Sequence, residues 1–180
     1  MILGLDISTS TTGYCIFDEN GLLHIGYICL KKHTGLFEKA AEIKRAMQNI
    51  KEKYDIKEIA VEENLQAFRP GLSSAGTLMK LAQFNGVVQW ICYEVFGIPA
   101  ISFNVNTARK TVGLKIRRKD PMTTKDQVLA WVQLQEPKYN WPIREVTRGR
   151  NKGQVRFLNE CYDMADAYVI AKSCYILGKK

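Results

Sequence analysis

Two acidic residues that end apolar segments are the first candidates for chemistry in this chain. Asp6 lies in the apolar stretch of residues 2–7, which has strand character, and a lone buried charge is costly unless it is paired or bound to a metal. Glu62 ends a similar apolar stretch, and its neighbour Glu63 should point to the opposite face because successive strand residues alternate. We therefore select Glu62. Taken alone, Asp6 could also be solvated or cap the next turn.

Two further acids, Asp163 and Asp166, are spaced i, i+3 in the last predicted helix and so project from one face. They interrupt an otherwise apolar run. Two like charges this close repel each other and raise one pKa unless a cation lies between them. A purely structural explanation needs a nearby Lys or Arg, and only Lys172 within the helix and the segment before Leu158 offer one. For this pair alone, metal binding and a solvated acidic face both remain open.

The four carboxylates come without a cluster of His or Cys, and such a set suits hard cations, Mg²⁺ or Mn²⁺. Two such ions about 3.5–4 Å apart can activate a water and stabilise the leaving 3′-oxygen in phosphodiester hydrolysis. The chain has 26 Lys and Arg against 18 Asp and Glu, a net charge of +8. That balance favours a polyanionic partner, most often nucleic acid. The residues therefore suggest a metal-dependent nuclease.

The order of predicted elements gives the fold class. Expected strands cover residues 2–7, 13–18, 22–30, 57–62 and 100–103, and expected helices cover 35–54, 72–96, 105–112, 123–135 and 158–177. A turn at residues 19–21 joins the second and third strands into an antiparallel meander. Helical crossovers join the later strands, which predicts an α/β fold with a mixed five-stranded sheet, the meander followed by parallel strands, flanked by helices. The segment 136–156 is expected to be a long basic loop. With 180 residues and no boundary signal, we expect one domain, residues 1–180.

Three further features bear on the assembly of the protein and on its location in the cell. The predicted helix 72–96 is apolar over a wide stripe, so the part not needed for the core is a candidate subunit interface. The five cysteines are scattered without metal-ligand spacing, which suggests reduced thiols in the cytoplasm. The start lacks the basic region of a signal peptide, and no stretch is long enough for a membrane span.

At this point the sequence resembles the RuvC-type Holliday-junction resolvases of the RNase H-like superfamily, from residue 2 to about residue 176. The resemblance rests on G-L-D-I-S-T-S-T-T-G-Y at 4–14, A-V-E-E at 60–63, K-L-A-Q-F-N-G-V-V at 80–88 and Y-D-M-A-D-A at 162–167. Sugar kinases and actin-like ATPases share the first motif, but the ordered set is specific. The resemblance implies an RNase H-like fold. The family's four metal-binding acids map onto Asp6, Glu62, Asp163 and Asp166, and we expect Asp6 and Asp166 to bridge two ions.

The resemblance also implies an activity and an assembly. We expect a crossover junction endodeoxyribonuclease that nicks a four-way DNA junction symmetrically as a homodimer, with helix 72–96 at the interface. An RNase H-like nuclease acting on flaps, other branched DNA or RNA–DNA hybrid remains an alternative, as does a non-catalytic junction-binding relative. A phosphotransferase of the sugar-kinase type is disfavoured, because 180 residues leave no room for a second domain.

The remaining predictions concern DNA contacts. In the family, aromatic residues after the glutamate act at the junction centre, and here Phe68, followed by Arg69, is the nearest equivalent. Packing of Phe68 over the helix start is the alternative. The residues assigned as a group to backbone contact are Lys110, Lys115, Arg117, Arg118, Arg148, Arg150 and Lys152. A solvated loop is the alternative for each, and Lys110 or Lys115 is a candidate to steady the scissile phosphate. The basic segment 136–156 resembles an expanded loop of divergent members, which suggests a phage or virus origin.

Overall fold

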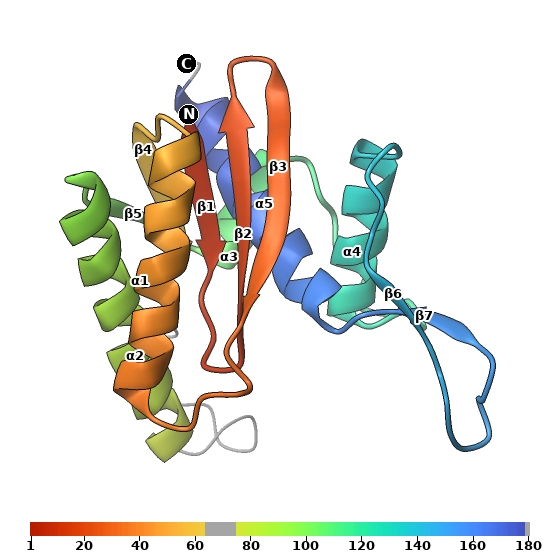
Figure 1. The fold of residues 1–180 in the computed structure, drawn as a ribbon. Helices are drawn as coiled ribbons and strands as arrows, with labels where there is room; N and C mark the ends of the chain where they lie inside the picture. Colours follow the sequence, from red (N-terminus) through yellow and green to blue (C-terminus); the bar gives the residue numbers. More distant parts are fainter. Residues whose placement is uncertain (64–74, 179–180) are drawn as a thin grey trace.

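The computed structural model describes residues 1–63 and 75–178, and its centre is a five-stranded mixed sheet in the order β3-β2-β1-β4-β5 (Figure 1). Strands β1 (Ile2–Asp6), β2 (Thr11–Asp18) and β3 (Gly21–Cys29) form an antiparallel meander. Strand β4 (Glu58–Glu62) pairs parallel to β1, and β5 (Ala100–Phe103) pairs parallel to β4. The predicted sheet is confirmed.

A tight turn sets the register of the meander. Gly21 has φ +127°, a backbone conformation that favours glycine. One carboxylate oxygen of Asp18 accepts hydrogen bonds from the backbone N–H groups of Asn20 at 2.7 Å and Gly21 at 3.1 Å. This turn brings β3 back beside β2.

Helices cover both faces of the sheet (Figure 1). On one face lie α1 (Leu36–Lys53) and α2 (Ala75–Phe96), which pack on each other. On the other face α5 (Glu160–Gly178) crosses β1 and β2, and α3 (Val105–Thr111) and α4 (Thr124–Gln135) pack against α5. Two apolar cores result, one on each side of the sheet.

Two glycines let α5 lie unusually close to the sheet. A Cβ on Gly4 would lie 2.6 Å from the Cβ of Ala171, and a Cβ on Gly13 would overlap the backbone carbonyl of Asp163. Any side chain at these positions would therefore push the helix outward. The close approach also fixes the height of the two α5 acids above the sheet.

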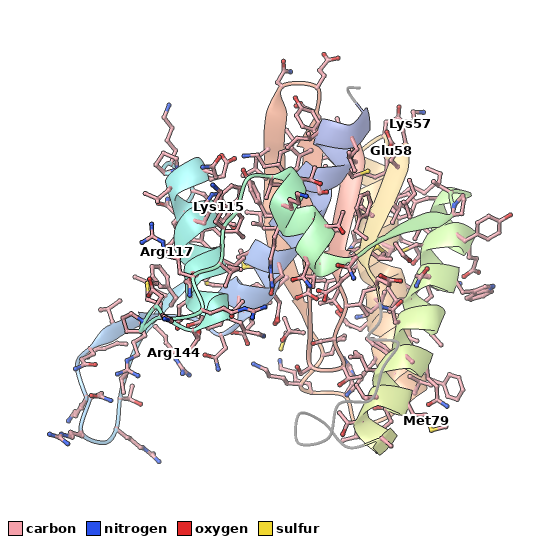
Figure 2. The ribbon with its side chains drawn as sticks, turned by 180° about the vertical axis from the view of Figure 1, so that it is seen from behind. Lys57, Glu58, Met79, Lys115, Arg117 and Arg144 are labelled. Atoms are coloured by element: carbon pink, nitrogen blue, oxygen red, sulfur yellow. The ribbon has the colours of Figure 1, made fainter. Side chains whose placement is uncertain are left out.

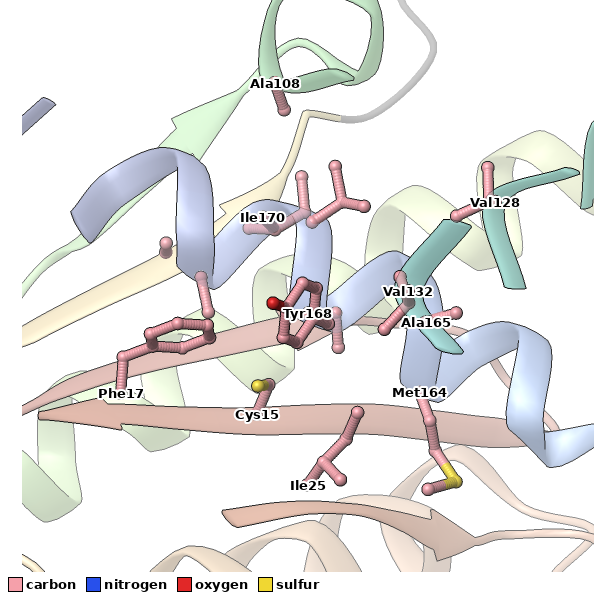
Figure 3. Close-up of a cluster of buried hydrophobic side chains, with 14 of the residues drawn as sticks. Cys15, Phe17, Ile25, Ala108, Val128, Val132, Met164, Ala165, Tyr168 and Ile170 are labelled. Carbon is pink, nitrogen blue, oxygen red and sulfur yellow. The ribbon is translucent and has the colours of Figure 1, made fainter. Parts of the chain in front are cut away.

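The interior of α5 explains why its acids stand in an apolar run. Tyr168 is fully buried, and its ring centroid lies 5.3 Å from that of Phe17 (Figure 3). The ring centroid of Trp131 lies 6.4 Å from that of Tyr168. The Tyr168 hydroxyl donates to Oε1 of Glu136 at 2.6 Å, which satisfies the only polar atom of the side chain. The helix is apolar because the sheet buries one side while α3 and α4 cover much of the rest.

The prediction that residues 136–156 form a loop was wrong, because the segment contains part of an antiparallel hairpin. Strand β6 (Ile143–Glu145) pairs with β7 (Val155–Phe157) in a separate two-stranded sheet. All six strand residues are exposed. The sequence lacks the usual strand signal because no core covers either face and so no alternation of apolar and polar residues is required.

The cysteines are free thiols, with Cys29 exposed and the other four buried. No described helix is both long enough and apolar enough to cross a membrane.

Candidate metal and nucleic-acid site

The first two predicted acids meet at one edge of the sheet. Asp6 and Glu62 are the last residues of the adjacent parallel strands β1 and β4. The register pairs Leu5 with Val61, which brings the next residues, Asp6 and Glu62, to the same carboxyl edge. In α/β sheets this edge is where ligands usually bind.

Helix α5 brings the other two acids to this edge. Gly13 is the cross-strand partner of Asp6, and the same glycine lies against the backbone of Asp163. The charges of Asp166, Glu62 and Asp163 each raise the pKa of Asp6, after burial, which is the largest cause. The structure therefore brings all four predicted carboxylates into one cluster, from β1, β4 and α5.

The cluster carries more negative charge than its surroundings neutralise. Burial is the main cause of a raised pKa at each of the four acids, reaching about 7 for Glu62 and about 6 for Asp163. The charge of Asp166 adds to the pKa rise of the other three. Buried carboxylates that repel one another gain free energy when a cation enters between them.

Two basic residues flank the acids, and the sequence analysis assigned neither to them. Nη2 of Arg109, in the last turn of α3, lies 3.4 Å from Oδ1 of Asp166. Nζ of Lys125, in the first turn of α4, lies 4.0 Å from Oδ1 of Asp163. Lys172, the candidate within the helix, instead donates to the hydroxyl of Tyr168 at 2.9 Å.

Helix caps fix these two basic residues in place. The side chain of Asn104 accepts hydrogen bonds from two backbone N–H groups at the start of α3. Thr123 and Asp126 form a capping box at the start of α4, and Tyr162 of α5 donates to Oδ1 of Asp126 at 2.7 Å. The caps are readable in the sequence, but the packing of both helices on α5 is not, so the sequence held no signal for the ion pairs.

The chemistry of the donor set suits a hard divalent cation, since it offers carboxylate oxygens and no thiolate or imidazole. Within residues 1–63 and 75–178, no three acidic, His or Cys side chains are arranged to hold an ion as they stand. Instead Arg109 holds Asp166, and the buried Nε of Arg109 has no hydrogen-bond partner in the described chain. The four acids fit a metal site because they offer carboxylate ligands and carry more negative charge than their surroundings neutralise. Arg109 and Lys125 supply only part of the counter-charge.

Glu63 is the neighbour of Glu62 that was not selected as a candidate metal ligand. Its side chain accepts a hydrogen bond from Nδ2 of Asn104 at 3.4 Å. The charge of Glu62 is among those that raise the pKa of Asp6.

The predicted DNA contacts fall on two exposed segments. Lys110 lies in the last turn of α3, and Lys115, Arg117 and Arg118 lie on the α3–α4 connection, all with exposed side chains. Figure 2 shows Lys115, Arg117 and Arg144 on the side of the molecule that carries α4, away from Lys57 and Glu58. Exposed side chains at the tip of the β6–β7 hairpin are Arg148, Arg150 and Lys152. Phe68 and Arg69 lie outside the described residues.

The outer surface of α2 carries exposed large apolar side chains. Met79 is 68%, Trp90 61% and Tyr93 56% exposed. Together with the exposed Gln83 and Gly86 they follow a 4-3-4-3 spacing along one face of the helix. This spacing is the one by which two helices pack along a common seam.

Comparison with known sequences identifies a family model and a curated relative that the chain resembles. The family model described as "Crossover junction endodeoxyribonuclease RuvC" matches residues 2–132, more than half of the chain. The match ends within α4, before the hairpin and α5. A curated relative, the crossover junction endodeoxyribonuclease RuvC of Aliarcobacter butzleri strain RM4018, is 31% identical over 100 residues, 53% of this chain. That alignment spans 61% of the relative's own length.

Solved structures share the fold across the whole chain. Thermus thermophilus RuvC in complex with a Holliday junction substrate superposes with a TM-score of 0.65 at 15% identity, covering 99% of this chain and 94% of that one. The yeast mitochondrial Holliday junction resolvase Ydc2 gives a TM-score of 0.53 at 16% identity, covering 97% and 77%. Unlike the family match, both alignments cover nearly the whole chain, and at these identities they show a shared fold.

Proposed function

Because the chain belongs to the RuvC family of crossover junction endodeoxyribonucleases, we propose that it is a metal-dependent, structure-selective endonuclease that resolves four-way DNA junctions. The observation that carries this proposal is the convergence of Asp6, Glu62, Asp163 and Asp166 at the carboxyl edge of the sheet. Buried carboxylates that repel one another can hold the divalent ions that phosphodiester hydrolysis uses, and nearby basic side chains can neutralise the phosphate.

The four acids are the proposed ligands of two Mg²⁺ or Mn²⁺ ions. Such ions, when bound, activate the attacking water and stabilise the leaving oxygen. The protein contributes a rigid frame, since Asp6 and Glu62 end paired strands and α5 is locked against β2 at Gly13. Arg109 and Lys125 offset part of the acids' negative charge and lie where an incoming phosphate would need neutralising.

A homodimer formed through α2 is the proposed assembly. The exposed seam of Met79, Gln83, Gly86, Trp90 and Tyr93 offers apolar area, and its central glycine allows close approach of a second helix. Among residues 1–63 and 75–178, no atom outside this helix lies within 4 Å of the position that a Cβ on Gly86 would take. A two-fold dimer would present two acid clusters to a two-fold junction, as paired symmetric cleavage demands.

The exposed basic residues extend the proposed interface beyond the acids. Lys110, Lys115, Arg117 and Arg118 lie on α3 and the α3–α4 connection, after Arg109 of α3 and before Lys125 in the first turn of α4. The connection is held in shape, because the backbone N–H of Arg117 donates to Oε1 of Gln127 at 2.8 Å. We assign these side chains to the phosphates next to the scissile one.

A substrate panel tests the proposal. A mobile four-way DNA junction, a flap, an RNA–DNA hybrid and linear duplex of matched sequence are incubated with the protein and Mg²⁺ or EDTA. The proposal expects paired nicks at symmetric positions on the junction and none in EDTA. Preferred cutting of the flap or the hybrid would support the metal site but refute the four-way junction as the preferred substrate. Binding of the junction without cleavage in Mg²⁺ or Mn²⁺ would refute the proposal that the protein is an endonuclease.

A further inference from the structure

The β6–β7 hairpin is a basic arm that projects from the body of the protein (Figure 1). Residues 143–157 hold five basic side chains against one acid, Glu145. In the described chain none of the five lies within ion-pair distance of a carboxylate, and Arg144 acts on Glu160 only at longer range. The arm therefore carries a net charge of +4 that no ion pair within the described residues compensates.

The ladder of the hairpin separates its two faces. Ile143 pairs with Phe157, Arg144 with Arg156, and Glu145 with Val155. Directly opposite residues share a face and successive residues alternate, so Arg144 and Arg156 stand together on the face opposite Ile143 and Phe157. Ile143 and Phe157 line a cavity with Tyr139 and Trp141 at the base of the arm. The arginine face is therefore the one turned away from this base.

Two arginines directly opposite each other destabilise a hairpin that is already marginal by its size. Arg156 Nη2 reaches only the neutral Oε1 of Gln154, at 3.0 Å. Folding alone gives no reason for such a pair. A polyanion lying across the ladder would attract both Arg144 and Arg156 and so offset the repulsion between them.

The base of the arm is anchored firmly. The hydroxyl of Tyr139 donates to the backbone carbonyl of Ile25 at 3.0 Å, and the rings of Tyr139 and Trp141 meet edge to face at 5.2 Å. The carbonyl of Pro142 accepts from the backbone N–H of Leu158 at 3.0 Å and from Sγ of Cys161 at 3.3 Å. The arm thus leads rigidly into the first turn of α5, which carries Asp163.

The tip is ordered too. The backbone N–H of Val146 donates to the carbonyl of Gln154 at 2.9 Å, and that of Gly153 donates to the carbonyl of Val146 at 2.8 Å. Gly149 and Gly153 take the positive φ values of 81° and 86° that close the loop. The ladder therefore extends past the strands and holds Arg148, Arg150 and Lys152 at a defined end.

We propose that this arm is a second DNA-binding element, in which Arg144 and Arg156 grip the phosphate backbone of a duplex arm beside the cleavage site. A two-stranded ribbon has the width that the major groove of duplex DNA admits, and five cations along it suit contacts that do not depend on sequence. The identity of that duplex as one arm of a branched substrate rests on the proposed function, whereas duplex binding by the arm does not.

Equilibrium binding in EDTA tests the arm, with linear duplex, a four-way junction and single-stranded DNA of the same sequence. The double variant R144S/R156S should bind duplex and junction on the order of tenfold more weakly, and the salt dependence of binding should lose a slope of about 2, one for each phosphate contact. R144K/R156K should bind like wild type. Since like charges are removed, the serine variant should also melt no lower than wild type.

K53S/K57S is the control, because it removes the same charge from two exposed positions, and Figure 2 shows Lys57 on the side of the molecule away from Arg144. An unchanged salt slope in R144S/R156S, an equal loss in K53S/K57S, or a loss confined to single strands would overturn the proposal. If R144S/R156S melts at a lower temperature than wild type, the same binding measurements are made with R144Q/R156Q. If wild type cuts no branched DNA, the proposed function fails while the duplex titration still decides the arm.

Discussion

Gly13 and Asp163 lie in direct backbone contact, so that a Cβ on the glycine would overlap the carbonyl of the aspartate. Gly13 is at the same time the cross-strand partner of Asp6. One glycine thus sets the distance between an acid at the end of β1 and an acid in the first turn of α5. The acid cluster depends on the absence of a side chain at this position.

Gly13→Ala should therefore disturb the site without touching an acid. The added methyl should push α5 away and cost roughly 1–3 kcal/mol of unfolding free energy, as overpacking usually does. It should also weaken Mg²⁺ binding measured by calorimetry. Gly35→Ala is the control, because a Cβ there would make only ordinary contact, 3.6 Å from Glu38. Equal Mg²⁺ affinity in both variants would show that α5 is not positioned in this way.

The raised pKa values predict how stability depends on pH in the metal-free protein. The pKa of Glu62 is raised to about 7 and that of Asp163 to about 6, so the folded state holds protons that the unfolded chain releases near pH 4. This contribution to stability is complete below about pH 4 and is lost as pH rises to about 7.

Asp6→Asn removes one of the interacting charges, so its advantage over wild type in EDTA should grow across the same pH window. Thermal melting of both proteins from pH 4 to pH 8 measures this difference. Saturating Mg²⁺ should shrink it, because the cation stabilises the wild-type carboxylates. A difference that stays constant with pH would mean that Asp6 does not share charge with the other acids.

Arg109 and Lys125 differ in burial, and their removal should differ accordingly. The Arg109–Asp166 pair has side chains only 16% and 12% exposed, so Arg109→Ala should cost about 3 kcal/mol of unfolding free energy near neutral pH without metal. The loss should be smaller near pH 5, where Asp166 takes up a proton more readily, and Mg²⁺ should restore much of it.

Lys125→Ala provides the comparison, since that side chain is 61% exposed and an exposed pair contributes at most about 1 kcal/mol. Denaturant unfolding with and without Mg²⁺ measures both variants. If the two alanine variants lose the same stability, Arg109 is not the main counter-charge of the cluster.

The α2 seam should control assembly. Replacing the exposed Trp90 and Tyr93 in W90S/Y93S should shift the protein to monomers in analytical ultracentrifugation, because these rings form the largest apolar area of the seam. Mg²⁺ binding should persist, while paired nicking should fall to isolated nicks. L134S removes an apolar side chain that is 78% exposed on α4 and should leave assembly unchanged. A wild type that is monomeric at all concentrations would refute the dimer.

The sequence reveals those parts of the site that local pattern determines. Asp6 and Glu62 stand out because each ends a strand that is otherwise apolar, and the spacing of Asp163 and Asp166 follows from helix geometry. The mixed sheet follows from a readable turn and from helical crossovers.

What the sequence leaves out depends on packing between distant elements. Arg109 reaches Asp166 only because α3 rests on α5, and no local pattern encodes that contact. The hairpin was missed because its three-residue strands bury nothing and so carry no apolar alternation. Gly13 is visible in the sequence, but the helix that it admits is 150 residues away.

The most direct test of the central claim is single-turnover cleavage of a four-way DNA junction by wild type and Asp6→Asn, with Mg²⁺ titrated from an EDTA baseline and the nicks mapped on all four strands. The account predicts paired symmetric nicks that rise with Mg²⁺, and a rate lower by about a thousandfold or more in the variant, because one proposed ligand of the metal ions is lost. Undiminished cleavage by Asp6→Asn, or cleavage that persists in EDTA, would contradict it.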